Sequence, residues 1–150
     1  MKTVYLIRHG HPALIRDGAM GIGITDPPLS AQGKAEAQAL ATHLPPVTAV
    51  FSSPLRRAVQ TAHAFGMPVT VLDGLREINP HRPDGPDPDL IRFRAAMDEA
   101  AHRAAGDFLV VSHGGIIARF LQSLTGTFRK PDYAEVVTLG YDREEFFLIK

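Results

Sequence analysis

Two clusters of polar residues follow apolar segments at distant points of the chain. Arg8-His9-Gly10 comes directly after residues 4–7, and Ser112-His113-Gly114-Gly115 closes the apolar run 108–112. Histidine can act as a nitrogen nucleophile, arginine is a permanent cation, and glycine lets a ligand come close to the backbone. The two clusters therefore point to chemistry on an anion, provided that the fold brings them together.

The pattern of apolar runs and turn residues predicts strands that alternate with helices. We expect Ser30 to cap a helix to about residue 43, and Ser53 to cap a helix that begins at Pro54. Further helices are expected at 90–105 and 114–124, and strands at 4–7, 47–51, 69–72, 108–112, 136–139 and 146–149. The predicted fold class is α/β: a three-layer αβα sandwich with a mostly parallel central sheet and an antiparallel hairpin at its edge.

Such a fold places the carboxyl ends of parallel strands along one edge of the sheet. If the first and fourth strands are neighbours, His9 and His113 face one crevice, and the glycines that open the last helix add backbone N–H donors. Arg57 lies in the first turn of the helix after the second strand, on the same edge. A guanidinium group binds phosphate oxygens through two hydrogen bonds, so the set predicts a site for a phosphoryl group.

Composition narrows the function classes. The chain has 150 residues, of which 45% are hydrophobic, and this is sufficient for the core of a single domain over 1–150. Sixteen basic and sixteen acidic residues provide no overall field for nucleic acid or a membrane surface. The absence of cysteine excludes thiolate catalysis and cysteine-bound metal. With no signal peptide or membrane-length apolar run, we expect a cytoplasmic protein; its oligomeric state is not indicated.

Five segments, in order along the chain, resemble the histidine phosphatase superfamily, also called the phosphoglycerate-mutase-like family. They are LIRHG at 6–10, DPPLS at 26–30 with Gly33, SSPLRRAVQTA at 52–62, LRE at 75–77 and VSHGG at 111–115. The resemblance covers nearly the whole chain. It implies a phosphohistidine formed on His9, with a proton transferred by Glu77 and no cofactor.

The resemblance also implies which residues hold the phosphate. The phosphoryl oxygens would be bound by Arg8, Arg57 and His113, and Gly10 and Gly114 would let the substrate approach the backbone. Arg56 lies about 100° around the helix from Arg57 and is expected to face elsewhere.

The chain departs from the mutase members of the family. They carry a longer insertion between the glutamate and the second histidine, and an arginine in the stretch after the glutamate, where this chain has Ile78, Asn79 and Pro80. We therefore expect the phosphatase branch: a phosphomonoesterase of the histidine acid phosphatase type, acting on a small phosphorylated metabolite. The loop at 12–29 is similar to that of α-ribazole phosphatases, whereas the short chain is similar to protein phosphohistidine phosphatases. Phosphoglycerate-mutase-type phosphotransfer on the same site stays open as an alternative.

Two hypotheses from other classes remain. His9 and His11 have the spacing of two metal ligands, and with His113 and Glu77 they would make a metal-dependent hydrolase. Arg8 places a cation beside that metal, so we expect no metal site. A non-catalytic phosphate-binding protein would have lost at least one catalytic residue, and none is missing.

Other polar residues have weaker assignments. His11 and His81 lie beside proposed site residues in loops, which makes them candidate substrate contacts. Arg92, Arg94 and Arg103 are expected to form a polar helix face.

Overall fold

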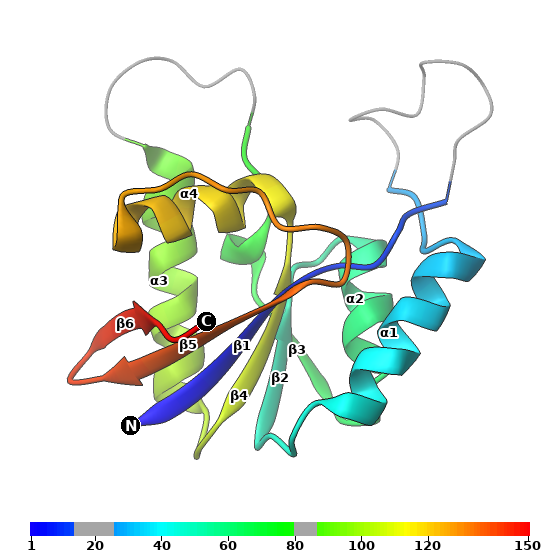
Figure 1. The fold of residues 1–150 in the computed structure, drawn as a ribbon, viewed down its shortest axis with the longest axis horizontal. Helices are drawn as coiled ribbons and strands as arrows, with labels where there is room; N and C mark the ends of the chain where they lie inside the picture. Colours follow the sequence, from blue (N-terminus) through cyan, green and yellow to red (C-terminus); the bar gives the residue numbers. More distant parts are fainter. Residues whose placement is uncertain (14–25, 80–86) are drawn as a thin grey trace.

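A computed structural model describes residues 1–13, 26–79 and 87–150, and its element order is that of an alternating α/β fold (Figure 1). Its elements are β1 (Lys2–Arg8), α1 (Ala31–His43), β2 (Ala49–Ser52), α2 (Arg56–His63), β3 (Val69–Val71), the 3₁₀ helix η2 (Asp73–Leu75), α3 (Pro88–Arg103), β4 (Phe108–Ser112), α4 (Gly114–Thr125), β5 (Val136–Asp142) and β6 (Glu145–Leu148).

The strands form one six-stranded sheet in the order β3-β2-β4-β1-β5-β6. The pairs among β3, β2, β4 and β1 are parallel, whereas β5 and β6 add an antiparallel hairpin at one edge. β1 lies directly beside β4, with Arg8 opposite Ser112. The expected neighbourhood of the first and fourth strands is confirmed, and it brings both polar clusters to the same edge of the sheet.

Each face of the sheet has its own apolar core. Alternate residues of a strand point to opposite faces, so Val110 faces one core while Leu109 and Val111 face the other. Residues of α3 and α4 line the larger core, and residues of α1 and α2 line the smaller one. Figure 1 shows α3 and α4 on one side of the sheet and α1 and α2 on the other. The predicted three-layer αβα arrangement with an antiparallel edge is confirmed.

Helix ends explain several element boundaries. Ser30 caps α1 as predicted, because its hydroxyl oxygen accepts a hydrogen bond from the Gly33 N–H. Asp87 caps α3 in the same way, through the Leu90 N–H, and Pro88 occupies the first turn. The first turns of these helices are therefore well defined by local sequence.

The predicted start of α2 is wrong. Ser53 is not its cap, because the Ser53 N–H still donates to the Val111 carbonyl of β4 and keeps this residue bonded to the sheet. The helix begins at Arg56, whose N–H donates to Asp26 Oδ1. A carboxylate distant in sequence therefore takes the capping role.

Within the described ranges, no helix combines the length and apolar character needed to cross a membrane.

Candidate active site

His9 lies immediately after β1, at the carboxyl ends of the parallel strands. Its backbone N–H donates to the Ser112 carbonyl of β4 and holds it there. Its side chain is buried, with Nδ1 2.7 Å from the carbonyl oxygen of Gly10. Because a carbonyl only accepts, Nδ1 carries the ring proton and Nε2 has the free lone pair of the neutral ring. The Arg57 Nε–H donates to that Nε2 over 3.2 Å. The fold thus fixes which nitrogen of His9 can attack.

Burial lowers the pKa of His9 to about 4, and the positive charges of Arg57 and Arg8 act in the same direction. The hydrogen bond to the Gly10 carbonyl opposes them. The ring is therefore neutral at neutral pH and offers its lone pair without a base to deprotonate it.

His113 stands at the N-cap position of α4, with its ring centroid 5.1 Å from that of His9. Its side chain is 1% exposed, and its Nε2 lies 2.8 Å from the Ser53 hydroxyl. Burial lowers the pKa of His113 well below its ordinary value, and the positive charges of Arg57, Arg8 and, once it is protonated, His9 act in the same direction. Ser53 Oγ accepts from the Leu55 N–H, and one arrangement of the pair has the Ser53 hydroxyl donating its proton to His113 Nε2. In that tautomer His113 Nδ1 carries a hydrogen.

Two arginines flank the histidines. Arg8 donates from one terminal nitrogen to the Pro131 carbonyl over 2.8 Å, and its Cζ lies 4.0 Å from the centroid of the Tyr133 ring. A terminal guanidinium nitrogen of Arg57 lies 3.7 Å from Asp26 Oδ1, within ion-pair distance. The pKa of Arg57 lies below its ordinary value because the side chain is partly buried, and the negative charges of Asp26 and Glu77 oppose this shift. The cluster is therefore cationic while its histidines are neutral.

Some buried polar atoms of this cluster have no hydrogen-bond partner among the described residues. In the part of the chain that the structure describes, three buried side-chain atoms have no hydrogen-bond partner: Arg8 Nε, His113 Nδ1 and the Tyr141 hydroxyl. The first two belong to the histidine and arginine cluster. Buried polar atoms are normally paired, so two unpaired nitrogens here are a reason to expect an anionic ligand.

Glu77 lies against the N-terminus of α4. Its Oε1 accepts from the N–H groups of Ile78 and Ile116, and its Oε2 accepts from that of Gly115. The N–H groups and the positive end of the helix dipole stabilise the carboxylate charge. The sequence predicted that N–H groups at the start of this helix would serve the anionic substrate; those of Gly115 and Ile116 hold Glu77.

The glycines of the site permit close packing. A Cβ on Gly115 would lie 2.9 Å from Glu77 Oε1, and one on Gly114 would lie 2.9 Å from Arg8 Nε. A Cβ on Gly10 would lie 2.7 Å from the carbonyl oxygen of Gly33, while the Gly10 N–H donates to Thr61. Gly10 is thus explained by its packing against α1, and a contact with phosphate remains a prediction for it.

A comparison with family models matches residues 4–91 to the histidine phosphatase superfamily (branch 1). This chain belongs to that superfamily. A curated relative, the mouse protein 6-phosphofructo-2-kinase/fructose-2,6-bisphosphatase 1, is 37% identical over 82 residues. That match covers 52% of this chain but only 17% of the mouse protein.

Several solved structures share the fold over nearly the whole chain. YhfR of Bacillus stearothermophilus aligns with a TM-score of 0.80 and 21% identity, over 99% of this chain and 96% of its own. An Escherichia coli K-12 protein, provisionally assigned as an α-ribazole-5′-phosphate phosphatase, aligns with a TM-score of 0.76 and 22% identity, over 99% and 95%. At these identities the likeness establishes the fold and leaves the substrate open.

The structure brings together most of the residues that the histidine phosphatase resemblance singled out. His9 contacts Arg57 directly, and its ring packs edge-on against that of His113. The exposed Arg56 is the neighbour of Arg57 that we expected to face elsewhere. His11 is partly buried, with its Nδ1 2.8 Å from the Ser30 hydroxyl and its ring against that of Tyr133. His81 lies outside the described residues.

Sequence reasoning missed two residues that contact this cluster. Tyr133 packs against the rings of both His9 and His11 as well as against Arg8. Ser53 was assigned to a helix cap but contacts His113. The SSPLRRAVQTA segment drew attention to Ser53 without showing its partner, while nothing in the local pattern around Tyr133 signals its position.

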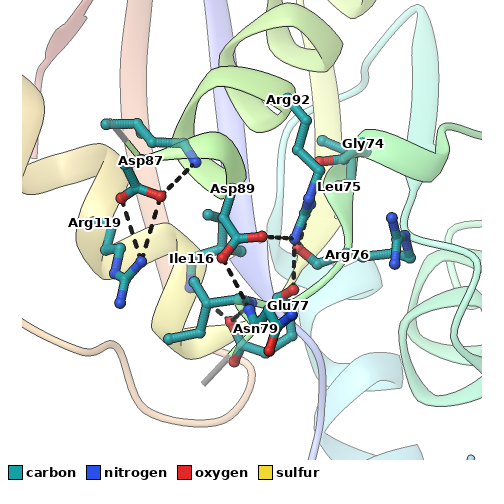
Figure 2. A network of polar contacts seen from close by, with 12 residues as sticks. Gly74, Leu75, Arg76, Glu77, Asn79, Asp87, Asp89, Arg92, Ile116 and Arg119 are labelled. Atoms are coloured by element: carbon teal, nitrogen blue, oxygen red, sulfur yellow. Dashed lines mark hydrogen bonds and ion pairs between the residues drawn. The ribbon is translucent and has the colours of Figure 1, made fainter. Parts of the chain in front are cut away.

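The interpretation of Arg92 as part of a polar helix face is wrong. Its guanidinium is largely buried and donates to the carbonyl oxygens of Gly74, Arg76 and Glu77 (Figure 2). The helical pattern places Arg92 on α3 but does not reveal that its side chain turns toward the segment that carries Glu77.

Proposed function

We propose that this protein is a cofactor-independent phosphomonoesterase that forms a phosphohistidine on His9. The observation that supports this most is a buried, neutral His9 whose Nε2 lone pair faces the guanidinium of Arg57. A phosphorus atom bonded to Nε2 would have its oxygens within reach of that guanidinium. The bisphosphatase named in the mouse relative supports a phosphate ester as substrate.

In the first step, His9 Nε2 attacks phosphorus and the bond from phosphorus to the ester oxygen breaks. The Gly10 carbonyl keeps its hydrogen bond to Nδ1 and stabilises the positive charge that develops on the ring. Arg8 Nε and His113 Nδ1, both without a partner, donate to phosphoryl oxygens. Phosphoryl transfer requires mainly positioning and charge stabilisation, which these donors supply.

Glu77 supplies the proton for the leaving group, and its carboxylate first takes that proton from the monoanionic form of the phosphate ester as the substrate binds. Each carboxyl oxygen has two lone-pair sites; Oε1 uses both on N–H donors, whereas Oε2 uses one. The remaining site on Oε2 is where we place the proton. After it passes to the departing oxygen, Glu77 takes a proton from water, the water oxygen attacks phosphorus, and the bond from phosphorus to His9 breaks. Phosphate is released and the enzyme is regenerated.

The metal-dependent alternative fits the site poorly. His9 Nδ1 donates to a carbonyl and Nε2 accepts from Arg57, so both ring nitrogens already have partners suited to a neutral imidazole. Arg8 and Arg57 would both repel a divalent cation bound at His9. This ring environment favours an anion.

Phosphate release from a panel of substrates tests the proposal. The panel contains p-nitrophenyl phosphate, sugar phosphates, phosphoglycerates, α-ribazole phosphate and a phosphohistidine protein, each assayed with and without a chelator. We expect turnover of at least one ester that is unaffected by the chelator and lost in His9→Ala. Turnover above a few percent in folded His9→Ala would contradict the mechanism, and loss with the chelator would favour the metal-dependent hydrolase. Vanadate binding without turnover of any substrate would favour the phosphate-binding protein.

A further inference from the structure

Arg92, in the first half of α3, binds the backbone of the segment that leads to Glu77. One terminal nitrogen donates to the carbonyl oxygens of Gly74 and Arg76, each over 2.8 Å, and the other donates to that of Glu77 over 2.6 Å. Three carbonyl groups within four residues thus converge on one guanidinium, as Figure 2 shows. Only the planar fork of arginine reaches all of them; a lysine ammonium is a single point.

Asp89 completes the arrangement from the same helix. Its Oδ1 lies 3.2 Å from the Arg92 guanidinium, and its Oδ2 accepts from the Asn79 N–H over 2.9 Å. The carboxylate is buried, so its charge is balanced by the guanidinium that it orients. Arg92 and Asp89 therefore hold the chain on both sides of Glu77.

Glu77 is consequently fixed at both of its ends. Its backbone is bound by α3 through Arg92, and its carboxylate is bound by the N-terminus of α4 through Gly115 and Ile116. Loss of the contact with α3 leaves the carboxylate attached to a segment free to shift. Proton transfer requires hydrogen-bond distance between donor and acceptor, so a small shift lowers its rate.

We propose that Arg92, oriented by Asp89, is a positioning residue that sets Glu77 Oε2 for protonation of the leaving group. The inference rests on the proposed phosphatase function. It predicts a dependence on the leaving group: an alkoxide needs a proton in order to leave, whereas p-nitrophenolate is a stable anion and leaves without one. Arg92 therefore matters for alkyl phosphates and little for p-nitrophenyl phosphate.

The test measures kcat/KM, which reports the steps up to departure of the leaving group, for p-nitrophenyl phosphate and for glycerol 2-phosphate. In Arg92→Lys and Arg92→Met we expect losses of roughly 10- to 100-fold on the alkyl ester and less than about threefold on the aryl ester. The inhibition constant of vanadate should stay unchanged. Arg94→Met is the matched control, because Arg94 lies on the same helix and donates to Ser123, away from Glu77; it should leave both substrates unaffected.

A double-mutant cycle with Glu77→Gln separates positioning from a general structural effect. The single Glu77→Gln change should discriminate between the two esters in the same sense, and adding Arg92→Met to it should cost nothing further on the alkyl ester. Asp89→Asn, which keeps an oxygen for the Asn79 N–H, is a milder second variant with an expected loss of about three- to tenfold on the alkyl ester only. It keeps the test valid if the Arg92 variants unfold.

Equal losses on both esters, or an Arg92 effect that persists beside Glu77→Gln, would overturn the inference and leave the phosphatase proposal standing. Absence of His9-dependent turnover in the wild-type protein would instead overturn the proposed function, and this inference with it.

Discussion

The two halves of the candidate site differ in whether their buried polar atoms have hydrogen-bond partners. In the phosphoryl half, formed by Arg8, His9, Arg57 and His113, two buried nitrogen atoms have no partner. In the carboxylate half, both oxygens of Glu77 are bound by backbone N–H groups. Buried donors without a partner gain hydrogen bonds when an anion binds, whereas the Glu77 carboxylate already has backbone partners that hold it in place. The difference fits the proposal that the phosphoryl half receives the substrate and the carboxylate half acts on it.

The largest expected effect comes from removing a cation from the phosphoryl half. Arg57→Met should lower kcat/KM by roughly two to three orders of magnitude, because the partly buried guanidinium near His9 Nε2 can no longer stabilise phosphoryl oxygens. Steady-state kinetics with Arg56→Met as the control checks this, since Arg56 is exposed and its variant should stay within about twofold of wild type. Equal effects of the two changes would remove Arg57 from the site.

Because His9 is held neutral in the folded protein, we expect the free energy of unfolding to fall as the pH is lowered. The folded ring titrates near pH 4, whereas an unfolded histidine titrates near its ordinary 6.5. Between these values the unfolded chain binds more protons, so this contribution to stability is present above pH 6.5 and is lost as the pH falls toward 4. Between pH 7 and pH 5, His9→Asn should lose about 2 kcal/mol less unfolding free energy than wild type.

Urea unfolding at the two pH values measures this difference. His63→Asn, which changes an exposed histidine at the end of α2, should lose as much stability as the wild-type protein. The same loss in His9→Asn as in wild type would mean that His9 is not held neutral.

Gly115→Ala should displace the Glu77 carboxylate without changing any residue that we propose to bind phosphate. The new Cβ would lie 2.9 Å from Glu77 Oε1, so Gly115→Ala should push the carboxylate off the start of α4. We expect kcat/KM for an alkyl phosphate to fall about tenfold, with vanadate inhibition unchanged. A matched loss of vanadate affinity would show that the two halves are not separate.

The smallest effect should come from the support of His113. Ser53→Ala leaves His113 Nε2 buried without its partner, which should cost about 1 kcal/mol of stability and weaken vanadate inhibition about fivefold. Ser52→Ala is the control: this buried hydroxyl donates to the Ser53 carbonyl and does not contact His113. The control should lose similar stability and keep its vanadate affinity. Unchanged vanadate inhibition in Ser53→Ala would show that the hydroxyl does not orient His113.

The sequence was most informative where local pattern decides the structure. The buried run 108–112 is β4 with the predicted bounds, and the Ser30 cap starts α1 as predicted. Where distant residues meet, the pattern carried no signal. Asp26 caps α2 from 30 residues away, and Arg92 reaches carbonyl groups that no periodicity identifies. The site motifs marked which residues carry chemistry, but not the contacts that orient them.

The most direct test of the central claim is to trap the phosphoenzyme. The wild-type protein would be mixed with p-nitrophenyl phosphate, quenched in alkali to preserve phosphohistidine, digested, and mapped by mass spectrometry. The account predicts an alkali-stable, acid-labile phosphate on His9, in larger amount in Glu77→Gln because attack by water is slowed, and none in His9→Ala. Phosphate on another residue, or turnover by a protein that never carries phosphate on His9, would contradict it.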